Sequence, residues 1–167
     1  MQNVRTAEPH NTLPLPAVED EDAASRSAAR LLITSSTREA VESVARRVHL
    51  AGSRAELPFV HTWACDFPVE VEALRGQCCS LLDAAAGGSL LIADIEEMPL
   101  VVQDVLIEVL AGLELSRSPS AAVRFISGTT ESLLDRVAAG TFSARLFYRL
   151  NIIHLMVGNG CPATAHI

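Results

Sequence analysis

Short apolar runs alternate with amphipathic segments from about residue 30 onward. Runs of this length are typical of strands that are buried on both faces of a sheet. We expect five strands, over residues 30–34, 57–63, 89–95, 123–127 and 151–157. Because helices are predicted between them, the alternation indicates an α/β fold with a parallel sheet that is covered on both faces.

The segments between the strands carry helix signals. Val41, Val44 and Val48 recur at helical spacing, and Ser36 followed by Glu39 predicts a capping box at the start of that helix. Further helices are expected over 69–82 with a turn at Gly76, from Pro99 to about Gly112, and over 133–139.

The two ends of the chain lack this periodicity. Residues 1–27 contain prolines and the acidic run 19–22, which predicts a flexible tail or linker, with a partner-docking peptide as the alternative. Glycine and proline break the pattern after residue 158. We therefore expect one domain over 28–158 and a short C-terminal tail over 159–167.

Composition narrows the class of protein. The chain has 167 residues, of which 49% are hydrophobic, and this favours a compact core over disorder. A formal net charge of −7 disfavours direct binding to DNA. No apolar run approaches the roughly 18 residues that a membrane span needs, and the first residues do not form a secretory leader, so a cytoplasmic location is expected.

The cysteines do not predict a metal site. Cys65, Cys78, Cys79 and Cys161 form no C-x-x-C pair. His61 and Cys65 would lie on one face of a strand about 13 Å apart, which is too far to share a metal. Redox activity of the adjacent pair is the alternative, but we expect buried or unreactive thiols in a reducing compartment.

A resemblance to a known family rests on the segment 87–99, GGSLLIADIEEMP, a predicted buried strand followed by acidic residues. It resembles the GGTLFLDEIGDMP block of bacterial enhancer-binding proteins, the AAA+ activators of sigma-54 RNA polymerase. Residues 57–60 resemble the start of that family's second strand. Two later segments resemble its DVRIIAATN and FREDLYYRLN blocks, in family order, over 122–130 and 142–151. The resemblance implies a five-stranded AAA+ P-loop-type core over 28–158, without the helical lid.

The phosphate-loop positions depart from the family. The family sequence GESGTGKE aligns without gaps on residues 35–42. Its glycines are replaced by Ser35, Arg38 and Ala40, its lysine is replaced by Val41, and only Glu42 matches. Because such a loop needs glycines for its amide cradle and a lysine for the terminal phosphates, tight ATP binding is not expected. Weak binding of ATP or magnesium stays open, and no cofactor is predicted.

The Walker B positions also differ. The resemblance puts Ala93 at the magnesium-holding aspartate and Asp94 at the glutamate that orients water. Asp94 is interpreted as a helix cap or a solvent-facing carboxylate, with a weak metal ligand as the alternative. Glu96 and Glu97 are interpreted as loop charges.

The remaining family positions lie further along the chain. The sensor asparagine is Thr130. Of the two arginines that reach toward a neighbouring subunit's phosphate, one is Ser143 and the other is retained as Arg149. Arg149 is interpreted as a surface salt bridge, with a role in trans at an intact partner's site as the alternative.

Three functional elements of the family have no counterpart. The GAFTGA loop, which contacts sigma-54, is missing between residues 74–76 and 80–88. Because the sequence stops where the helical lid would begin, we expect neither that lid nor a helix-turn-helix. We therefore expect neither direct contact with sigma-54 nor direct DNA binding.

The sequence predicts a catalytically degenerate domain, a pseudo-ATPase without catalytic or metal-binding residues. We expect it to regulate transcription by binding an intact AAA+ activator, or by self-association, through heterologous contacts. Two alternatives stay open: an ATP-binding activator with atypical motifs, for which Asp94, Glu42 and Arg149 are the support, and a non-catalytic scaffold. Whether the effect is inhibitory or assisting, and in which pathway, does not follow from the sequence.

Overall fold

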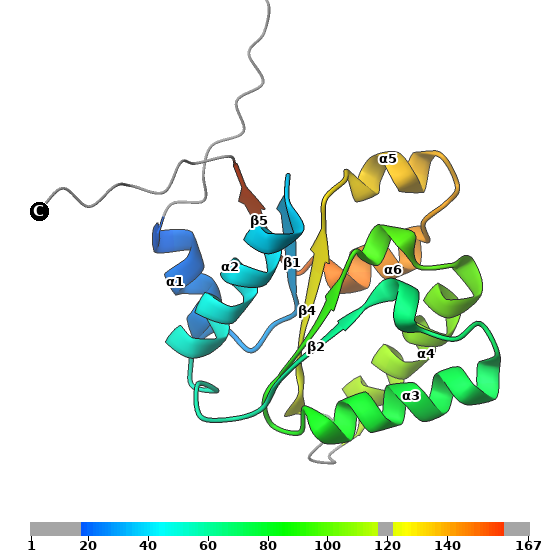
Figure 1. The fold of residues 1–167 in the computed structure, drawn as a ribbon, viewed down its shortest axis with the longest axis horizontal. Helices are drawn as coiled ribbons and strands as arrows, with labels where there is room; N and C mark the ends of the chain where they lie inside the picture. Colours follow the sequence, from blue (N-terminus) through cyan, green and yellow to red (C-terminus); the bar gives the residue numbers. More distant parts are fainter. Residues whose placement is uncertain (1–17, 117–121, 159–167) are drawn as a thin grey trace, which may run out of the picture.

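A five-stranded parallel sheet forms the centre of the computed structural model (Figure 1). The structure describes residues 18–116 and 122–158. The strand order is β2-β3-β4-β1-β5. The strands are β1 (Leu31–Ser35), β2 (Phe59–Trp63), β3 (Ser89–Ala93), β4 (Arg124–Thr129) and β5 (Ile153–Val157). The prediction of an α/β fold with a parallel five-stranded sheet is confirmed.

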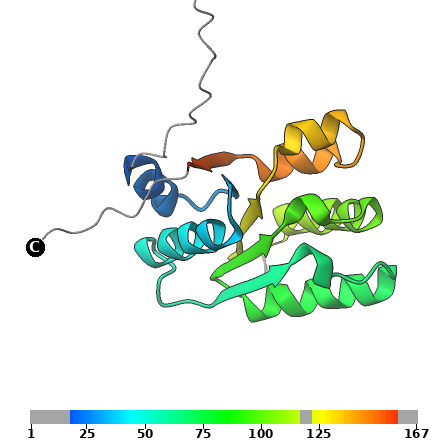
Figure 2. The same ribbon diagram turned by 45° about the horizontal axis from the view of Figure 1, so that its top comes forward.

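Helices cover both faces of this sheet, as Figure 2 shows. One face packs against α1 and α2, and the other packs against α3, α4 and α6. The helices are α1 (Val18–Arg26), α2 (Arg38–Ala51), α3 (Val71–Ala84), α4 (Leu100–Leu115), α5 (Leu133–Ala138) and α6 (Ala144–Leu150). Two short 3₁₀ turns, η1 (Ala64–Asp66) and η2 (Ile95–Glu97), follow β2 and β3.

Helices α2, α3 and α4 differ from the prediction. Thr37, not Ser36, caps α2, because its hydroxyl accepts a hydrogen bond from the amide of Ala40 at 3.2 Å. Helix α3 runs without a turn through Gly76, and α4 continues past Gly112 to Leu115. A glycine inside a helix costs only about 1 kcal/mol, which the buried faces of both helices outweigh.

The prediction of a flexible tail up to residue 27 is wrong from Val18 onward. Helix α1 packs against α2, and Ala24 is buried. The two carboxylate oxygens of Glu21 accept hydrogen bonds from Arg47 at 3.0 and 2.9 Å, and Arg124 donates to the carbonyl of Ala24 at 2.7 Å. The rest of that tail, the C-terminal tail 159–167 and Cys161 lie outside the described residues.

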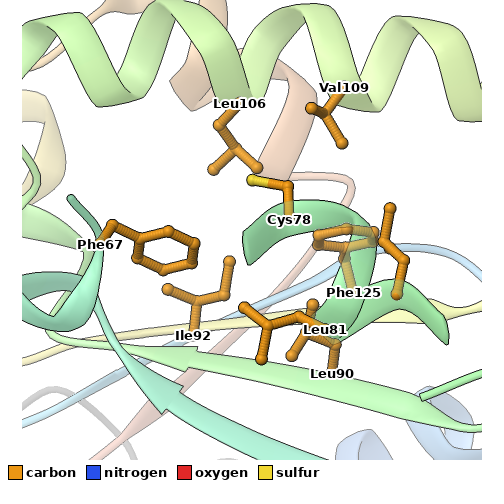
Figure 3. Close-up of a pocket in the computed structure, with 9 residues that line it drawn as sticks. Phe67, Cys78, Leu81, Leu90, Ile92, Leu106, Val109 and Phe125 are labelled. Carbon is orange, nitrogen blue, oxygen red and sulfur yellow. The ribbon is translucent and has the colours of Figure 1, made fainter. Parts of the chain in front are cut away.

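An apolar pocket lies between the sheet and the pair α3 and α4 (Figure 3). Cys78 points from α3 into this pocket, beside Phe67, Leu106 and Phe125. Burial raises the pKa of the Cys78 thiol to about 11. The prediction of a buried, unreactive thiol therefore agrees with the position of Cys78, whereas Cys65 and Cys79 are exposed.

Candidate functional site at the carboxyl edge of the sheet

The sheet brings most of the predicted site positions to one edge. Ser35 ends β1, Ala93 ends β3, and Thr130 directly follows β4. These three strands are neighbours in the order β3-β4-β1 and run parallel, so their carboxyl ends lie together. Ligands of open α/β sheets bind at this edge.

The connection from β1 to α2 is short. Strand β1 ends at Ser35 and α2 begins at Arg38, so only Ser36 and Thr37 join them. A phosphate loop places a longer glycine-containing segment between strand and helix. The Thr37 hydroxyl also engages the amide of Ala40, one of the free amides that a phosphate would otherwise approach.

Val41, where the resemblance puts the family's lysine, points into the core. Its side chain is only 2% exposed and belongs to the apolar cluster beneath α1 and α2. A methyl group added at Gly128 on β4 would lie 2.2 Å from the Cγ1 atom of Val41. Helix α2 therefore packs this side chain directly onto the backbone of the sheet.

Arg38, where the resemblance puts a glycine of the family, turns toward the carboxylates after β3. Its Nε lies 2.7 Å from Oδ2 of Asp94, and its Nη2 donates to Oε1 of Glu97 at 3.3 Å. The guanidinium also lies over the ring of Trp63, with Cζ 5.8 Å from the ring centroid. The positively charged side chain of Arg38 thus occupies the carboxyl edge of the sheet.

The interpretation of Asp94 as a cap or a solvent-facing carboxylate is wrong. Its side chain is 5% exposed, makes no capping hydrogen bond and pairs with Arg38. Its backbone has a φ of 52°, in the left-handed region that aspartate tolerates better than most residues. Burial raises the pKa of Asp94, Arg38 opposes this shift, and the charges of Glu96 and Glu97 add to it.

Glu96 is not a loop charge, because it is only 5% exposed. Its Oε1 accepts hydrogen bonds from the amide and the hydroxyl of Thr130, both at 2.9 Å. Its Oε2 is buried and has no hydrogen-bond partner among the described residues. Glu96 thus ties η2 to the end of β4. Glu97 is about half exposed, as predicted.

Arg149 lies at the opposite, amino edge of the sheet. Its Nη1 donates to both carboxylate oxygens of Glu114, at 3.0 and 3.1 Å. Arg30, which precedes β1, donates to the same carboxylate at 2.7 Å and to the backbone carbonyl of Arg149 at 3.2 Å. Arg149 thus forms a partly exposed salt bridge, and the fold keeps it away from Asp94.

Two further predicted positions serve local structure. Ser143 caps α6 by accepting a hydrogen bond from the amide of Leu146 at 3.4 Å. Glu42 lies on the surface of α2, where it pairs with Arg46 at 2.9 Å. Among the described residues, no group of three or more potential ligands could hold a metal ion, and no helix is long and apolar enough to cross a membrane.

Comparison with known proteins links this fold to a family. The family model of the sigma-54 interaction domain matches residues 71–156. The regulatory protein AtoC of Escherichia coli K12 is 33% identical over 149 residues, which cover 78% of this chain and 32% of AtoC. The nitrogen assimilation regulatory protein NtrX of Azorhizobium caulinodans is 32% identical over 143 residues, which cover 77% of this chain and 32% of NtrX. The chain thus spans about a third of the length of these curated relatives.

Two solved structures superimpose on this chain. NtrX of Brucella abortus in complex with ATP superimposes with a TM-score of 0.72 at 26% identity, covering 92% of this chain and 39% of that chain. The P-loop NTPase domain of the sigma-54 transport activator from E. coli shares the fold, with a TM-score of 0.63 at 19% identity, and the match covers 83% of this chain and 97% of that domain. On these matches, the chain belongs to the sigma-54 interaction domain family.

Proposed function

We propose that this chain is a catalytically inactive sigma-54 interaction domain that binds an intact activator of its own family and modulates that activator's output. The coarser assignment, an activator-like domain in transcription regulation, follows from the family and from relatives such as AtoC and NtrC. The finer assignment rests on the carboxyl edge of the sheet.

The ion pairs of Arg38 carry the proposal. In P-loop enzymes, magnesium and a lysine neutralise the phosphates at this edge, and an acidic residue after a strand holds the metal. Here the Arg38 guanidinium lies 2.7 Å from Asp94 and 3.3 Å from Glu97. Arg38 thereby engages one oxygen each of Asp94 and Glu97, and its positive charge would weaken magnesium binding at these two carboxylates.

The composition of the chain supports the same reading. All 13 basic residues are arginines, so no lysine elsewhere in the sequence could replace the missing phosphate-loop lysine. Val41 itself is buried against Gly128. Since the connection between β1 and α2 has only two residues, it also offers few backbone amides to a polyphosphate.

Helix α3 supports the absence of direct sigma-54 contact. The resemblance locates the polymerase-contacting loop between Gly76 and Ser80, and both residues lie inside the continuous helix Val71–Ala84. The described chain therefore has no projecting loop at that point. We infer that any effect on transcription passes through a partner that has the loop.

A nucleotide titration tests the inactive site. Full-length protein is titrated with a fluorescent ATP analogue and magnesium, beside the central domain of E. coli NtrC as a positive control, and phosphate release is measured in parallel. We expect saturable binding and hydrolysis only for NtrC. Hydrolysis by this chain that disappears in Asp94→Ala would instead establish the alternative, an ATP-dependent activator with atypical motifs.

Affinity capture tests the binding part. The tagged chain is recovered from its native cells, and co-purified proteins are identified by mass spectrometry. We expect an intact sigma-54 activator to be enriched over a tag-only control. Enrichment of other proteins, with no activator recovered from cells that express one, would favour a scaffold role.

A further inference from the structure

Arg38 connects the carboxyl ends of three strands. It begins α2, shortly after β1, and its guanidinium pairs with Asp94 and Glu97, which follow β3. The same guanidinium lies over the ring of Trp63, the last residue of β2. One side chain therefore contacts the segments at the ends of β2 and β3 from the segment that follows β1.

Glu96 extends these links to a fourth strand. It lies in η2, after β3, and accepts hydrogen bonds from the amide and the hydroxyl of Thr130, which follows β4. Gln103, which is wholly buried in the first turn of α4, donates to the carbonyls of Met98 and Thr141 at 2.7 and 3.2 Å. The segment after β3 is thus bonded to the segments that follow β4 and α5.

Both charged residues are additions relative to the family sequences quoted above. The resemblance puts a glycine of GESGTGKE at Arg38, and it puts the glycine of GGTLFLDEIGDMP at Glu96. Because glycine has no side chain, neither set of contacts could form in a chain with those sequences. These links are therefore particular to the residues of this chain.

The charges at this edge explain why a cation is needed there. Burial, and then the charges of Glu96 and Glu97, raise the pKa of Asp94, whereas Arg38 lowers it. Glu96 is buried too, and its Oε2 atom has no hydrogen-bond partner among the described residues. Where carboxylates gather at a magnesium site, the metal ion supplies the positive charge. Here a side chain of the protein supplies it.

We propose that Arg38 is a tethered cation that holds the carboxyl edge of the sheet in one conformation without magnesium or nucleotide. Without this cation, the carboxylates of Asp94 and Glu97 would repel each other, and the segment after β3 would open more often. Since the cation belongs to the chain, it stays in place whatever the concentration of magnesium or ATP. An activator would then meet the same edge with or without nucleotide, a consequence that rests on the proposed function.

Hydrogen exchange of the full-length chain tests this role, because it measures how often a segment opens. The informative amides are those of Glu97 and Thr130, one in each of the two segments that Glu96 joins. The first donates to the carbonyl of Asp94 and the second donates to Glu96, both at 2.9 Å. Exchange is measured by mass spectrometry on peptides that cover these amides, with and without magnesium chloride and ATP.

Paired variants separate the effect of this charge from a general loss of charge on α2. Arg38→Gln removes the cation and keeps a polar side chain, whereas Arg38→Lys keeps the charge without the planar guanidinium. The matched control is Arg46→Gln. Arg46 also lies on α2, pairs with Glu42 at 2.9 Å and lies over the ring of Phe59, with Cζ 4.9 Å from the centroid. Circular dichroism melts check that every variant folds.

We expect magnesium and ATP to leave the exchange of both amides unchanged in wild type and in Arg46→Gln. In Arg38→Gln we expect both amides to exchange roughly tenfold faster, which is the effect of losing a hydrogen bond between charged groups. Arg38→Lys should lie between wild type and Arg38→Gln, because it retains the charge.

The results that would overturn the proposal are distinguishable from failure of the proposed function. Exchange at the wild-type rate in folded Arg38→Gln would show that other contacts hold the edge, and it would leave the proposed function in place. Slowing of wild-type exchange by magnesium and ATP would contradict both the tethered cation and the inactive site. Failure to capture an activator would reject the proposed function alone, since the exchange of these amides is measured without a partner.

Discussion

The contact between Val41 and Gly128 predicts a large energetic coupling between α2 and β4. A Cβ atom at Gly128 would lie 2.2 Å from Cγ1 of Val41 but 3.5 Å from its Cβ. Gly128→Ala alone therefore forces a clash, whereas in the double variant with Val41→Ala the new methyl group enters the space that the valine methyls leave. We expect the double variant to be much more stable than the sum of the two single changes predicts.

The magnitude follows from burial and packing. Val41 is 2% exposed, and removal of its two methyl groups costs about 1.6 kcal/mol in transfer free energy, or roughly 2–3 kcal/mol with the cavity. Overpacking by Gly128→Ala costs about 1–3 kcal/mol. Because the double variant retains only ordinary contacts at that point, a coupling energy of about 1–3 kcal/mol is expected between the two sites.

Equilibrium unfolding in urea measures this coupling. Trp63 is the only tryptophan of the chain, so its fluorescence follows unfolding from a single residue. Circular dichroism of the backbone follows the same transition as an independent probe. A control cycle pairs Val41→Ala with Gly112→Ala, because a methyl group at Gly112 meets no atom within 4 Å, and these changes should add. Additivity within about 0.5 kcal/mol for Val41 with Gly128 would refute the reasoning, since it would place the Val41 side chain away from β4.

Three other expectations concern single residues. Gly76→Ala should stabilise the protein by about 0.5–1 kcal/mol in urea unfolding, because the position is helical and open, whereas Gly87→Ala should destabilise it because φ is 76° there. Asp94→Asn should raise the free energy of unfolding at about pH 7, since a raised pKa means that the carboxylate form of Asp94 costs folded-state stability. This gain should shrink as the pH falls through the raised pKa of Asp94, and an equal gain at about pH 4 would contradict the assignment. Iodoacetamide at neutral pH should alkylate Cys79 well before Cys78, whose pKa is raised to about 11, and site-resolved mass spectrometry would reveal the reverse order.

The strands were predictable because their signal is local. Strands β1 and β3 are almost wholly buried and mostly apolar, and such runs are typical of the inside of a parallel sheet. Their order was not predicted from the sequence, and the structure gives it as β2-β3-β4-β1-β5. The predicted third strand was two residues too long, since the chain turns into the left-handed region at Asp94.

Helix α1 was missed because it carries almost no apolar signal. It is short and acidic, and its hydrophobic contact with the domain rests largely on Ala24. Its anchors are Arg47 and Arg124, which are 26 and 100 residues away from their partners in the sequence. A pattern within the helix cannot reveal partners at that separation.

The sequence by itself determined the α/β class and the approximate strand positions, because these depend on local periodicity, and its resemblance to the family led to the expectation that the phosphate-loop glycines and lysine are replaced. Only the tertiary structure decided what the replacements do. It pairs Arg38 with Asp94 and buries Glu96 against Thr130, while Arg149 lies at the opposite edge of the sheet. The physical reason is that ion pairing and desolvation depend on distances between groups in the folded chain. The sequence shows which residues are charged, but it does not show which of them the fold brings together.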